Sequence, residues 1–522
     1  MQFIPKALLK KLYNRSSLRN TGDGVRLTVK NRLAPTRLER IERVALDGRD
    51  VPPSYIRLQF DAGPAMRADQ LADEHGMDFP LGTLLTMELA IDALEPGEHE
   101  IELAFRAERF GALSFSVRDA LRTGERDPDA IPRDPANDYS DAIIKERQAF
   151  VEHKTGCALD HITRYSIDPN TTRGNLEHFT GAAQIPLGIA GPLKINGEHA
   201  RGEFYVPLAT TEGTLVASYN RGMKVIAESG GVHCAVVGDN MQRAPVFGFG
   251  CAAEARQFVD WLNEHAEQIK QVCKDSDPFV ELKHIDYYLA SRFAYTRFNF
   301  TTGDAAGMNM VGKATFAACN WILGQFNEAE VRDFFLESNF ATDKKASQIN
   351  TMRTRGKRVT AECLVKRNVL RDIMDADTEQ LAQHARIANV GAMLSGANNN
   401  GAHAANGITA MFIATGQDVA NVAESSAGIL YTGLTEDKDL YISITLPSLI
   451  VATIGGGTGL PTQQEALNMM DCAGVGKVRK FAEIVAGTVL AGEISLAAAI
   501  SSLDWVSSHD QYGRNDPNKK GS

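Results

Sequence analysis

The spacing of apolar residues changes near residue 121, and this change constrains the fold more than any other feature of the chain. Residues 25–29, 56–60 and 101–105 alternate apolar with polar side chains, which predicts half-buried β-strands. The turn signal Glu95-Pro96-Gly97-Glu98 precedes the third of these segments. Short strands separated by turns favour a β-sandwich-like domain over residues 1–121. Because this part contains no catalytic constellation, we expect an accessory module with a structural or interaction role.

The second part begins after a stretch rich in proline, arginine and aspartate. This stretch, residues 122–139, is typical of an interdomain linker. Residues 142–153 then show helical periodicity, and strand patterns follow at 295–300 and 440–446 among further helices. A chain of 522 residues is too long for one ordinary domain. We therefore expect a multidomain α+β protein.

Composition and charge exclude several classes of protein. The formal net charge of -10 and the pI near 5.7 argue against a general nucleic-acid binder. The seven cysteines contain no CxxC pair, which favours reduced thiols and gives no metal-site signature. No run of about 18 uninterrupted apolar residues occurs, and the N-terminus becomes charged too early for a signal peptide. We expect a cytoplasmic protein without a membrane partner.

Two acidic residues stand beside apolar runs. Glu212 precedes a run that can begin a buried helix, and desolvation there would raise its pKa until it donates a proton near neutrality. Its four-residue context alone favours a simple helix-capping acid. Asp418 follows the apolar run 408–414, where a carboxylate without a partner is costly. Lys344 is its natural partner, and a proton network shared with Glu212 would couple all three.

Two basic side chains complete a possible catalytic set. The ammonium of Lys344 can stabilise the negative charge that develops on a carbonyl oxygen as hydride arrives. Its neighbours Asp343 and Lys345 can bind the other end of an acidic substrate, although such a run is more commonly a solvated turn. His509 lies near the C-terminus, where a mobile imidazole suits protonation of a departing thiolate, whereas a lone surface histidine has no such role. The set points to a reductase.

Two glycine-rich segments look suited to a phosphate-bearing cofactor. Residues 303–309 and 455–459 each follow a strand candidate. Neither has the GxGxxG spacing of a Rossmann fold, and each alone is more typical of a tight turn.

Taken together and in order, these motifs resemble the 3-hydroxy-3-methylglutaryl-coenzyme A (HMG-CoA) reductase family, in its soluble bacterial form of the class I type. The resemblance covers roughly residues 140–515. Its motifs are residues 185–193, 210–218, 303–310, 342–345, 403–406, 416–418, 455–459 and 508–509. The first 121 residues lie outside it and are weakly similar to small β-sandwich modules found beside bacterial carbohydrate enzymes.

The resemblance implies reduction of (S)-HMG-CoA to mevalonate and free coenzyme A by two hydride transfers. NADPH is the implied cofactor, and NADH is not excluded. Glu212 would donate a proton to the aldehyde oxygen, and Lys344 would stabilise the oxyanion. Asp418 would tune both, and His509 would protonate the coenzyme A thiolate.

The resemblance also implies the binding residues. The hydroxymethylglutaryl group would be held by Arg243, Asp343, Lys345 and Asn406. Coenzyme A would contact Ser218, Asn220 and Arg221. The nicotinamide cofactor would lie against Asp304, Gly307, Met308, Asn309, Gly455, Gly456 and Gly457. No metal is implied.

The family's architecture places a large catalytic domain at residues 140–244 and 336–522, around a long central helix. A ferredoxin-like cofactor domain at residues 245–335 would be inserted into it. Family members form homodimers or dimer-based oligomers that share active sites across the interface, so we expect the same here.

Several positions depart from the eukaryotic pattern. Glu337 replaces a substrate-contacting serine, and Ala306 replaces a methionine of the cofactor motif. A substrate-reaching lysine has no counterpart near Ala388, where Arg386 is the nearest basic residue. The arginine expected at the 2'-phosphate aligns near Pro278, and Asn515 replaces a regulatory phosphoserine. Two alternatives therefore stay open: a reductase of another branched acyl-CoA, and a catalytically silent homologue that binds the thioester.

Overall fold

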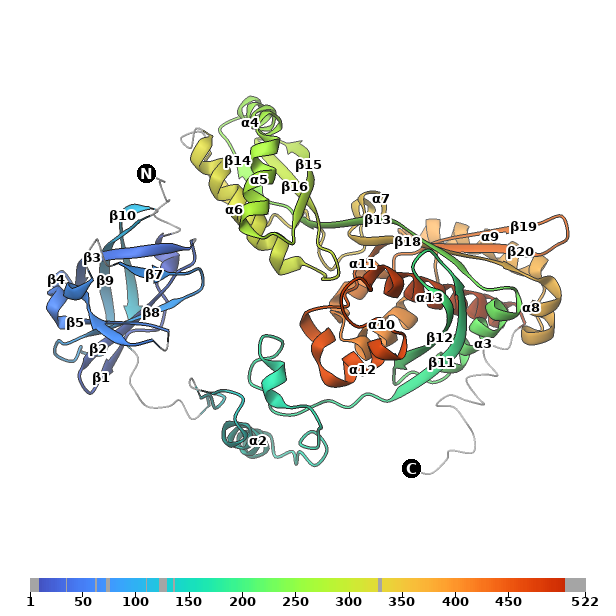
Figure 1. The fold of residues 1–522 in the computed structure, drawn as a ribbon, viewed down its shortest axis with the longest axis horizontal. Helices are drawn as coiled ribbons and strands as arrows, with labels where there is room; N and C mark the ends of the chain where they lie inside the picture. Colours follow the sequence, from blue (N-terminus) through green and yellow to red (C-terminus); the bar gives the residue numbers. More distant parts are fainter. Residues whose placement is uncertain are drawn as a thin grey trace. The chain divides into compact units, whose positions relative to one another are not determined.

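The computed structural model forms two compact units, Met1–Ala130 and Ile131–Ser522 (Figure 1). The boundary falls inside the segment 122–139 that the sequence predicts as a linker. The structure describes residues 9–33, 35–61, 63–71, 76–108, 110–121, 129–134, 137–326 and 331–502.

The N-terminal unit contains two antiparallel sheets. The order in the first is β1 (Arg19–Thr21), β2 (Gly24–Lys30), β8 (Leu84–Leu89), β5 (Ile56–Phe60) and β6 (Ala65–Arg67). The order in the second is β10 (Gly111–Ala120), β9 (Glu98–Ala107), β3 (Thr36–Leu46) and β4 (Arg49–Asp50), with β7 (Met77–Phe79) on β3. Short 3-10 helices occur at η1 (Lys10–Leu12), η2 (Pro53–Tyr55) and η3 (Ala68–Gln70). Alternate residues of both sheets are buried in one apolar core, so the period-two pattern directs one face of each sheet inward.

The second unit is organised on an eight-stranded antiparallel sheet. Its order is β17 (Asp333–Phe335), β14 (Val246–Gly248), β16 (Phe293–Thr301), β13 (His233–Arg243), β18 (Gly356–Val365), β20 (Leu440–Leu449) and β19 (Ile429–Leu434), with β15 (Glu281–Ala290) on β16. Residues 233–240 of β13 pair with β18, whereas Met241–Arg243 pair with β16. One strand therefore joins the two halves of the sheet. A separate hairpin contains β11 (Leu187–Asn196) and β12 (Arg201–Ala209).

Helices cover each half of this sheet separately. The β14–β17 half shares an apolar core with α4 (Ala252–Glu264), α5 (Ala266–Ser276) and α6 (Met308–Gln325). The other half shares a larger core with α3 (Leu215–Glu228), α8 (Arg367–Met374), α9 (Thr378–Ser395), α10 (Ala404–Thr415), α12 (Pro461–Met469) and α13 (Val478–Ser501). The remaining helices are α2 (Asp141–Thr155), α7 (Gln348–Arg353), α11 (Val422–Ser425), η5 (Pro169–Thr172), η7 (Val419–Asn421) and η8 (Gly456–Gly459).

Helix α13 is largely buried in the second unit. It has 24 residues and packs against α3, α10 and strands β13, β18 and β20. It is the one helix, within the described ranges, that is long and apolar enough to cross a membrane, but 78% of its most apolar window is buried in the fold. Its buried carboxylates Glu483 and Glu493 accept backbone N–H groups of residues 198–200 and 402–404. These features are those of a core helix.

Candidate functional site

Lys344 and Asp418 form the central ion pair of the site. Lys344 lies in the loop between β17 and α7, and Asp418 caps η7 just after α10. The distance from Lys344 Nζ to Asp418 Oδ2 is 3.0 Å, and the side chains are 44% and 39% exposed. The hydrogen bond to Asp418 raises the pKa of Lys344, so the ammonium is retained. The pair predicted from residue type is therefore present, and it faces solvent where a carbonyl group can approach.

The neighbours of Lys344 are already engaged within the chain. Asp343 accepts a 2.6 Å hydrogen bond from Nη2 of the buried Arg355. The ammonium of Lys345, an exposed residue, donates to the backbone oxygen of Asp343 at 3.2 Å. Asp343 therefore fixes the loop, and only its remaining lone pairs are available for the substrate contact that the sequence predicts.

Glu212 and Asn406 form a second pair. The Asn406 side-chain amide donates to both carboxylate oxygens of Glu212, at 2.9 and 3.0 Å. Glu212 precedes α3, and Asn406 lies in the first turn of α10. Glu212 is exposed, so this chain by itself does not provide the desolvation that the sequence led us to expect.

The two pairs lie at opposite ends of α10. Asn406 is at the start of this helix, whereas Asp418 follows its last residue, Thr415. Nine steps of about 1.5 Å place Asn406 and Thr415 about 14 Å apart along the axis. In the part of the chain that the structure describes, no hydrogen bond or ion pair joins Glu212 to Lys344 or Asp418. Among the described residues, Glu212 therefore does not contact the Lys344–Asp418 pair within one chain.

The residues predicted to reach coenzyme A lie on α3. Ser218 donates to the hydroxyl of Ser495 on α13 at 3.0 Å, and Arg221 donates to the same hydroxyl and to the Ser495 carbonyl at 3.3 Å. Asn220 accepts the backbone N–H of Gly191 on β11 at 2.9 Å. Ser495 was missed by sequence reasoning because a buried serine in an apolar helix carries no motif.

His403 is a further member of this cluster. It is buried and stacks on Tyr219, and its Nε2 lies 3.4 Å from the Ser218 hydroxyl. Burial lowers the pKa of His403 to about 4, so its ring is neutral at physiological pH. The motif at residues 403–406 drew attention to this position, but residue type alone assigned it no role.

The first glycine-rich segment leads into α6. Gly307 caps this helix with a φ of 76°, and the backbone N–H groups of the first turn attract anions. The Arg243 guanidinium donates to the Met308 carbonyl at 3.0 Å, so it lies at this loop, while Asn309 is exposed. The Asp304 carboxylate accepts the backbone N–H groups of Gly476 and Val478 at 2.8 and 3.1 Å. Asp304 therefore ties the loop to the start of α13.

The triple-glycine segment packs on the turn that leads to Asp418. A Cβ on Gly416 would lie 2.3 Å from the Gly457 oxygen, and a Cβ on Gly457 would lie 2.6 Å from the Gly416 oxygen. Gly455 and Gly456 have φ values of 81° and 56° with open space around them. Two backbones thus meet at a distance that only glycine permits, which places this loop beside the Lys344–Asp418 pair.

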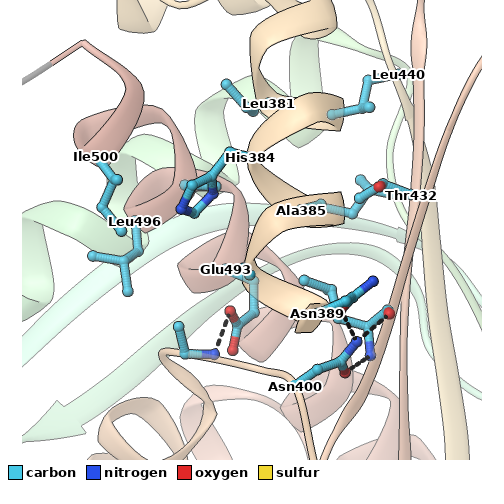
Figure 2. Close-up of a pocket in the computed structure, with 15 residues that line it drawn as sticks. Leu381, His384, Ala385, Asn389, Asn400, Thr432, Leu440, Glu493, Leu496 and Ile500 are labelled. Atoms are coloured by element: carbon cyan, nitrogen blue, oxygen red, sulfur yellow. Dashed lines mark hydrogen bonds between the residues drawn. The ribbon is translucent and has the colours of Figure 1, made fainter. Parts of the chain in front are cut away.

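A separate pocket lies between α9, α13 and strands β19 and β20 (Figure 2). Its lining is mostly apolar, and its polar members are His384, Asn389, Asn400, Thr432 and Glu493 (Figure 2). Ala388 belongs to its wall, and Arg386 is exposed. Of the predicted catalytic residues that the structure describes, Glu212, Lys344 and Asp418, none lines this pocket.

Other predicted positions complete the description. The Glu337 carboxylate accepts the backbone N–H of Asn339 at 2.9 Å. His509 and Asn515 lie outside the described residues. Glu198, His199 and Glu483 bring possible metal-ligand atoms within 4.8 Å of one another, but the Glu483 carboxylate already accepts backbone N–H groups there.

Comparison with known proteins places these residues in a family. Residues 143–514 match the family described as Hydroxymethylglutaryl-coenzyme A reductase. The chain belongs to this family. Residues 8–122 match "Hydroxymethylglutaryl-CoA reductase, N-terminal domain", so the expectation that this unit lies outside the family resemblance was wrong.

The HMG-CoA reductase relatives span archaea and plants. The chain is 45% identical over 377 residues to the 3-hydroxy-3-methylglutaryl-coenzyme A reductase of Pyrococcus abyssi, covering 70% of this chain and 92% of that protein. It is 40% identical over 385 residues to reductase 2 of Solanum tuberosum, covering 72% and 64%. The class II reductase of Streptococcus pneumoniae, solved bound to NADPH, has the same fold at 18% identity and a TM-score of 0.52, covering 68% and 96%.

Proposed function

We propose that this protein reduces (S)-HMG-CoA to mevalonate and free coenzyme A in the isoprenoid pathway, with NADPH as the hydride source. The observation that carries the proposal is the Lys344–Asp418 pair beside the glycine loops, in a family whose archaeal members bear this enzyme's name. A retained ammonium next to an anion-binding loop is the arrangement that hydride transfer to a thioester requires.

The residues divide the reaction between them. NADPH, when bound, supplies the hydride in both steps. The Lys344 ammonium, held by Asp418, stabilises the negative charge that develops first on the thioester oxygen and then on the aldehyde oxygen. His509 protonates the departing coenzyme A thiolate, and Glu212 in its acid form donates the final proton to the aldehyde oxygen. Asp418 keeps the ammonium charged and couples it to the proton donor.

The nicotinamide cofactor fits the groups at the glycine loops. The N-terminus of α6 at Gly307 and the open backbone at Gly455 and Gly456 suit its phosphates. Arg243 adds a cation at the same loop. Residues 245–335 would form the ferredoxin-like cofactor domain, inserted between parts 140–244 and 336–522 of a catalytic domain built around α13. Residues 1–121 would be accessory and 122–139 a linker.

The complete active site would combine two copies of the chain. One copy offers Lys344 and Asp418, and the other offers Glu212 and Asn406, because the two pairs lie at opposite ends of α10. The C-terminal half of α9 supports such an interface, since its apolar side chains Ile387, Val390, Met393 and Leu394 are 62%, 56%, 81% and 84% exposed. A second copy over Glu212 would also supply the desolvation that its acid form needs.

The proposed partners and location follow from the same features. We place the enzyme in the cytoplasm as a homodimer or dimer-based oligomer, with seven free thiols. Its net charge of -10 opposes nucleic-acid binding.

The direct test is an absorbance assay with purified protein, HMG-CoA and either NADPH or NADH. Consumption of about two equivalents of reduced nicotinamide per thioester is expected, and no consumption with either cofactor would refute the proposal. Glu337 and Ala388 favour one second candidate, a reductase of another branched acyl-CoA. A panel of acyl thioesters separates the two, since activity confined to a different thioester supports the second. An inactive protein that still binds HMG-CoA would indicate a silent homologue.

A further inference from the structure

The backbone of Lys344 has an unusual conformation and donates a hydrogen bond to Glu424. Its φ of 58° lies in the left-handed region, which costs a non-glycine residue roughly 1–2 kcal/mol. The backbone N–H of Lys344 donates to Glu424 Oε1 at 3.0 Å. Such a conformation persists only where its surroundings hold it. The hydrogen bond from this N–H group to Glu424 is therefore a contact that can hold Lys344 in place.

Glu424 is held in turn by buried polar groups. It is fully buried, and its Oε1 also accepts from the Asn421 side-chain amide at 3.0 Å. The Arg355 guanidinium lies beside it, with Nε 3.4 Å from the same oxygen, and is fully buried as well. Arg355 also donates to Asp343 at 2.6 Å and to the Gln242 carbonyl at 3.2 Å. One guanidinium therefore bridges the carboxylates of Asp343 and Glu424.

One short segment, residues 418–424, contacts both the side-chain ammonium and the backbone N–H of Lys344. Asp418 pairs with its ammonium, and Glu424, six residues later, binds its backbone N–H. The two anchors are rigidly related, because the Asp418 carboxylate caps η7 through the Ala420 N–H at 3.0 Å and α11 follows directly. We propose that Glu424, braced by Arg355, is a positioning residue that sets where the Lys344 ammonium points. This inference rests on the proposed reductase function.

The alternative is that the buried Arg355–Glu424 ion pair only stabilises the fold. The two hypotheses differ in the activity that they predict for the folded enzyme after the Glu424 carboxylate is removed. Glu424→Met keeps the length of the side chain but removes the acceptor, whereas Glu424→Gln retains an oxygen for the Lys344 N–H. Glu483→Met is a matched control, because Glu483 is also fully buried and accepts backbone N–H groups, but from residues 198–200.

The kinetic test uses the purified full chain with HMG-CoA and with the free aldehyde. A displacement of the ammonium by about 1 Å costs up to ~100-fold, so we expect kcat of Glu424→Met to fall ~10–100-fold on both substrates. The KM for HMG-CoA should change little, since Lys344 acts on the transition state. Glu424→Gln should recover most of kcat, and Glu483→Met should retain it per folded molecule. Equal kcat losses in the Glu424→Met and Glu483→Met variants, or equal losses in Glu424→Met and Glu424→Gln, would overturn the inference.

A second readout does not depend on activity. Amine labelling near pH 9, resolved by peptide mass spectrometry, compares Lys344 with its exposed neighbour Lys345 in the same molecule. Loss of the Asp418 contact increases the free-amine fraction of Lys344 by ~10-fold for each unit of pKa. Faster labelling of Lys344 in Glu424→Met, but not in Glu483→Met, supports the inference, and unchanged labelling refutes it.

This design distinguishes failure of the proposed function from failure of the inference about Glu424. A wild-type protein inactive on HMG-CoA would refute the proposed function, while the labelling result would still decide the role of Glu424. Should Glu424→Met fail to fold, Glu424→Asp withdraws the acceptor from the Lys344 N–H while keeping the charge beside Arg355. The same faster labelling is then expected, and its absence counts against the inference.

Discussion

Two inactive variants should restore activity to each other when they share a dimer. Glu212→Gln and Lys344→Ala disable pairs that α10 separates by about 14 Å, a gap that neither side chain spans within one chain. If each active site takes one pair from each copy, a mixed dimer contains one site in which both pairs are intact. If each site is built within one chain, no intact site exists in any dimer.

The expected magnitudes are well separated. Loss of the Lys344 ammonium should lower kcat by ~10²–10³, and loss of the Glu212 proton donor by ~10²–10⁴. In a random mixture of equal amounts, about half of the dimers contain one copy of each variant, and half of their sites are intact. About one quarter of wild-type activity should therefore return. Mixed dimers isolated through two different affinity tags should reach about one half.

The assay is NADPH oxidation with HMG-CoA after co-expression of the two tagged variants. Lys344→Ala mixed with Asp418→Asn is the matched control. Both substitutions disable the same ion pair, so every site of a mixed dimer contains a defective pair. Mixed Glu212→Gln and Lys344→Ala dimers as inactive as either parent would refute the shared site. Recovery in the control mixture would refute it equally.

Three further predictions address other parts of the site. His509→Gln should slow reduction of HMG-CoA but spare an aldehyde supplied directly, and equal loss in both assays would contradict the thiolate role. Gly416→Ala should destabilise the protein more than Gly455→Ala in urea unfolding, because both have left-handed φ values but only Gly416 would also meet the Gly457 oxygen at 2.3 Å. His403 has a folded pKa of about 4 against an ordinary 6.5, so the unfolded chain alone binds a proton in that window. The free energy of unfolding should therefore fall by roughly 3 kcal/mol as pH drops from about 6.5 to 4, and His403→Asn should flatten that slope.

The parts of the fold and site that could be predicted share a local signal. The strands at 25–29, 56–60 and 101–105 lie in β2, β5 and β9, because their alternation directs one face inward. The Lys344–Asp418 contact followed from the cost of leaving a carboxylate unpaired beside an apolar helix. In both cases the residues and their immediate neighbours contain the information.

The parts that could not be predicted depend on tertiary partners. Glu424 and Arg355 stand in ordinary sequence, and only folding brings them to Lys344 and Asp343. The exposure of Glu212 was also missed, because the adjacent apolar run suggested burial although that run directs its own side chains inward. Nothing in four residues of sequence indicates which side of a helix start is covered.

The length of α10 explains how the predicted contacts divide. The motifs at 403–406 and 416–418 are the two ends of one helix, so in the proposed dimer they would serve different sites. Arg243 lies at the predicted cofactor loop, whereas Asn406 lies with Glu212, although both were predicted to hold one acyl group. In the proposed dimer, a substrate held by both would span two copies. The cofactor and oxyanion groups would come from one copy, and the proton donor and coenzyme A contacts from the other.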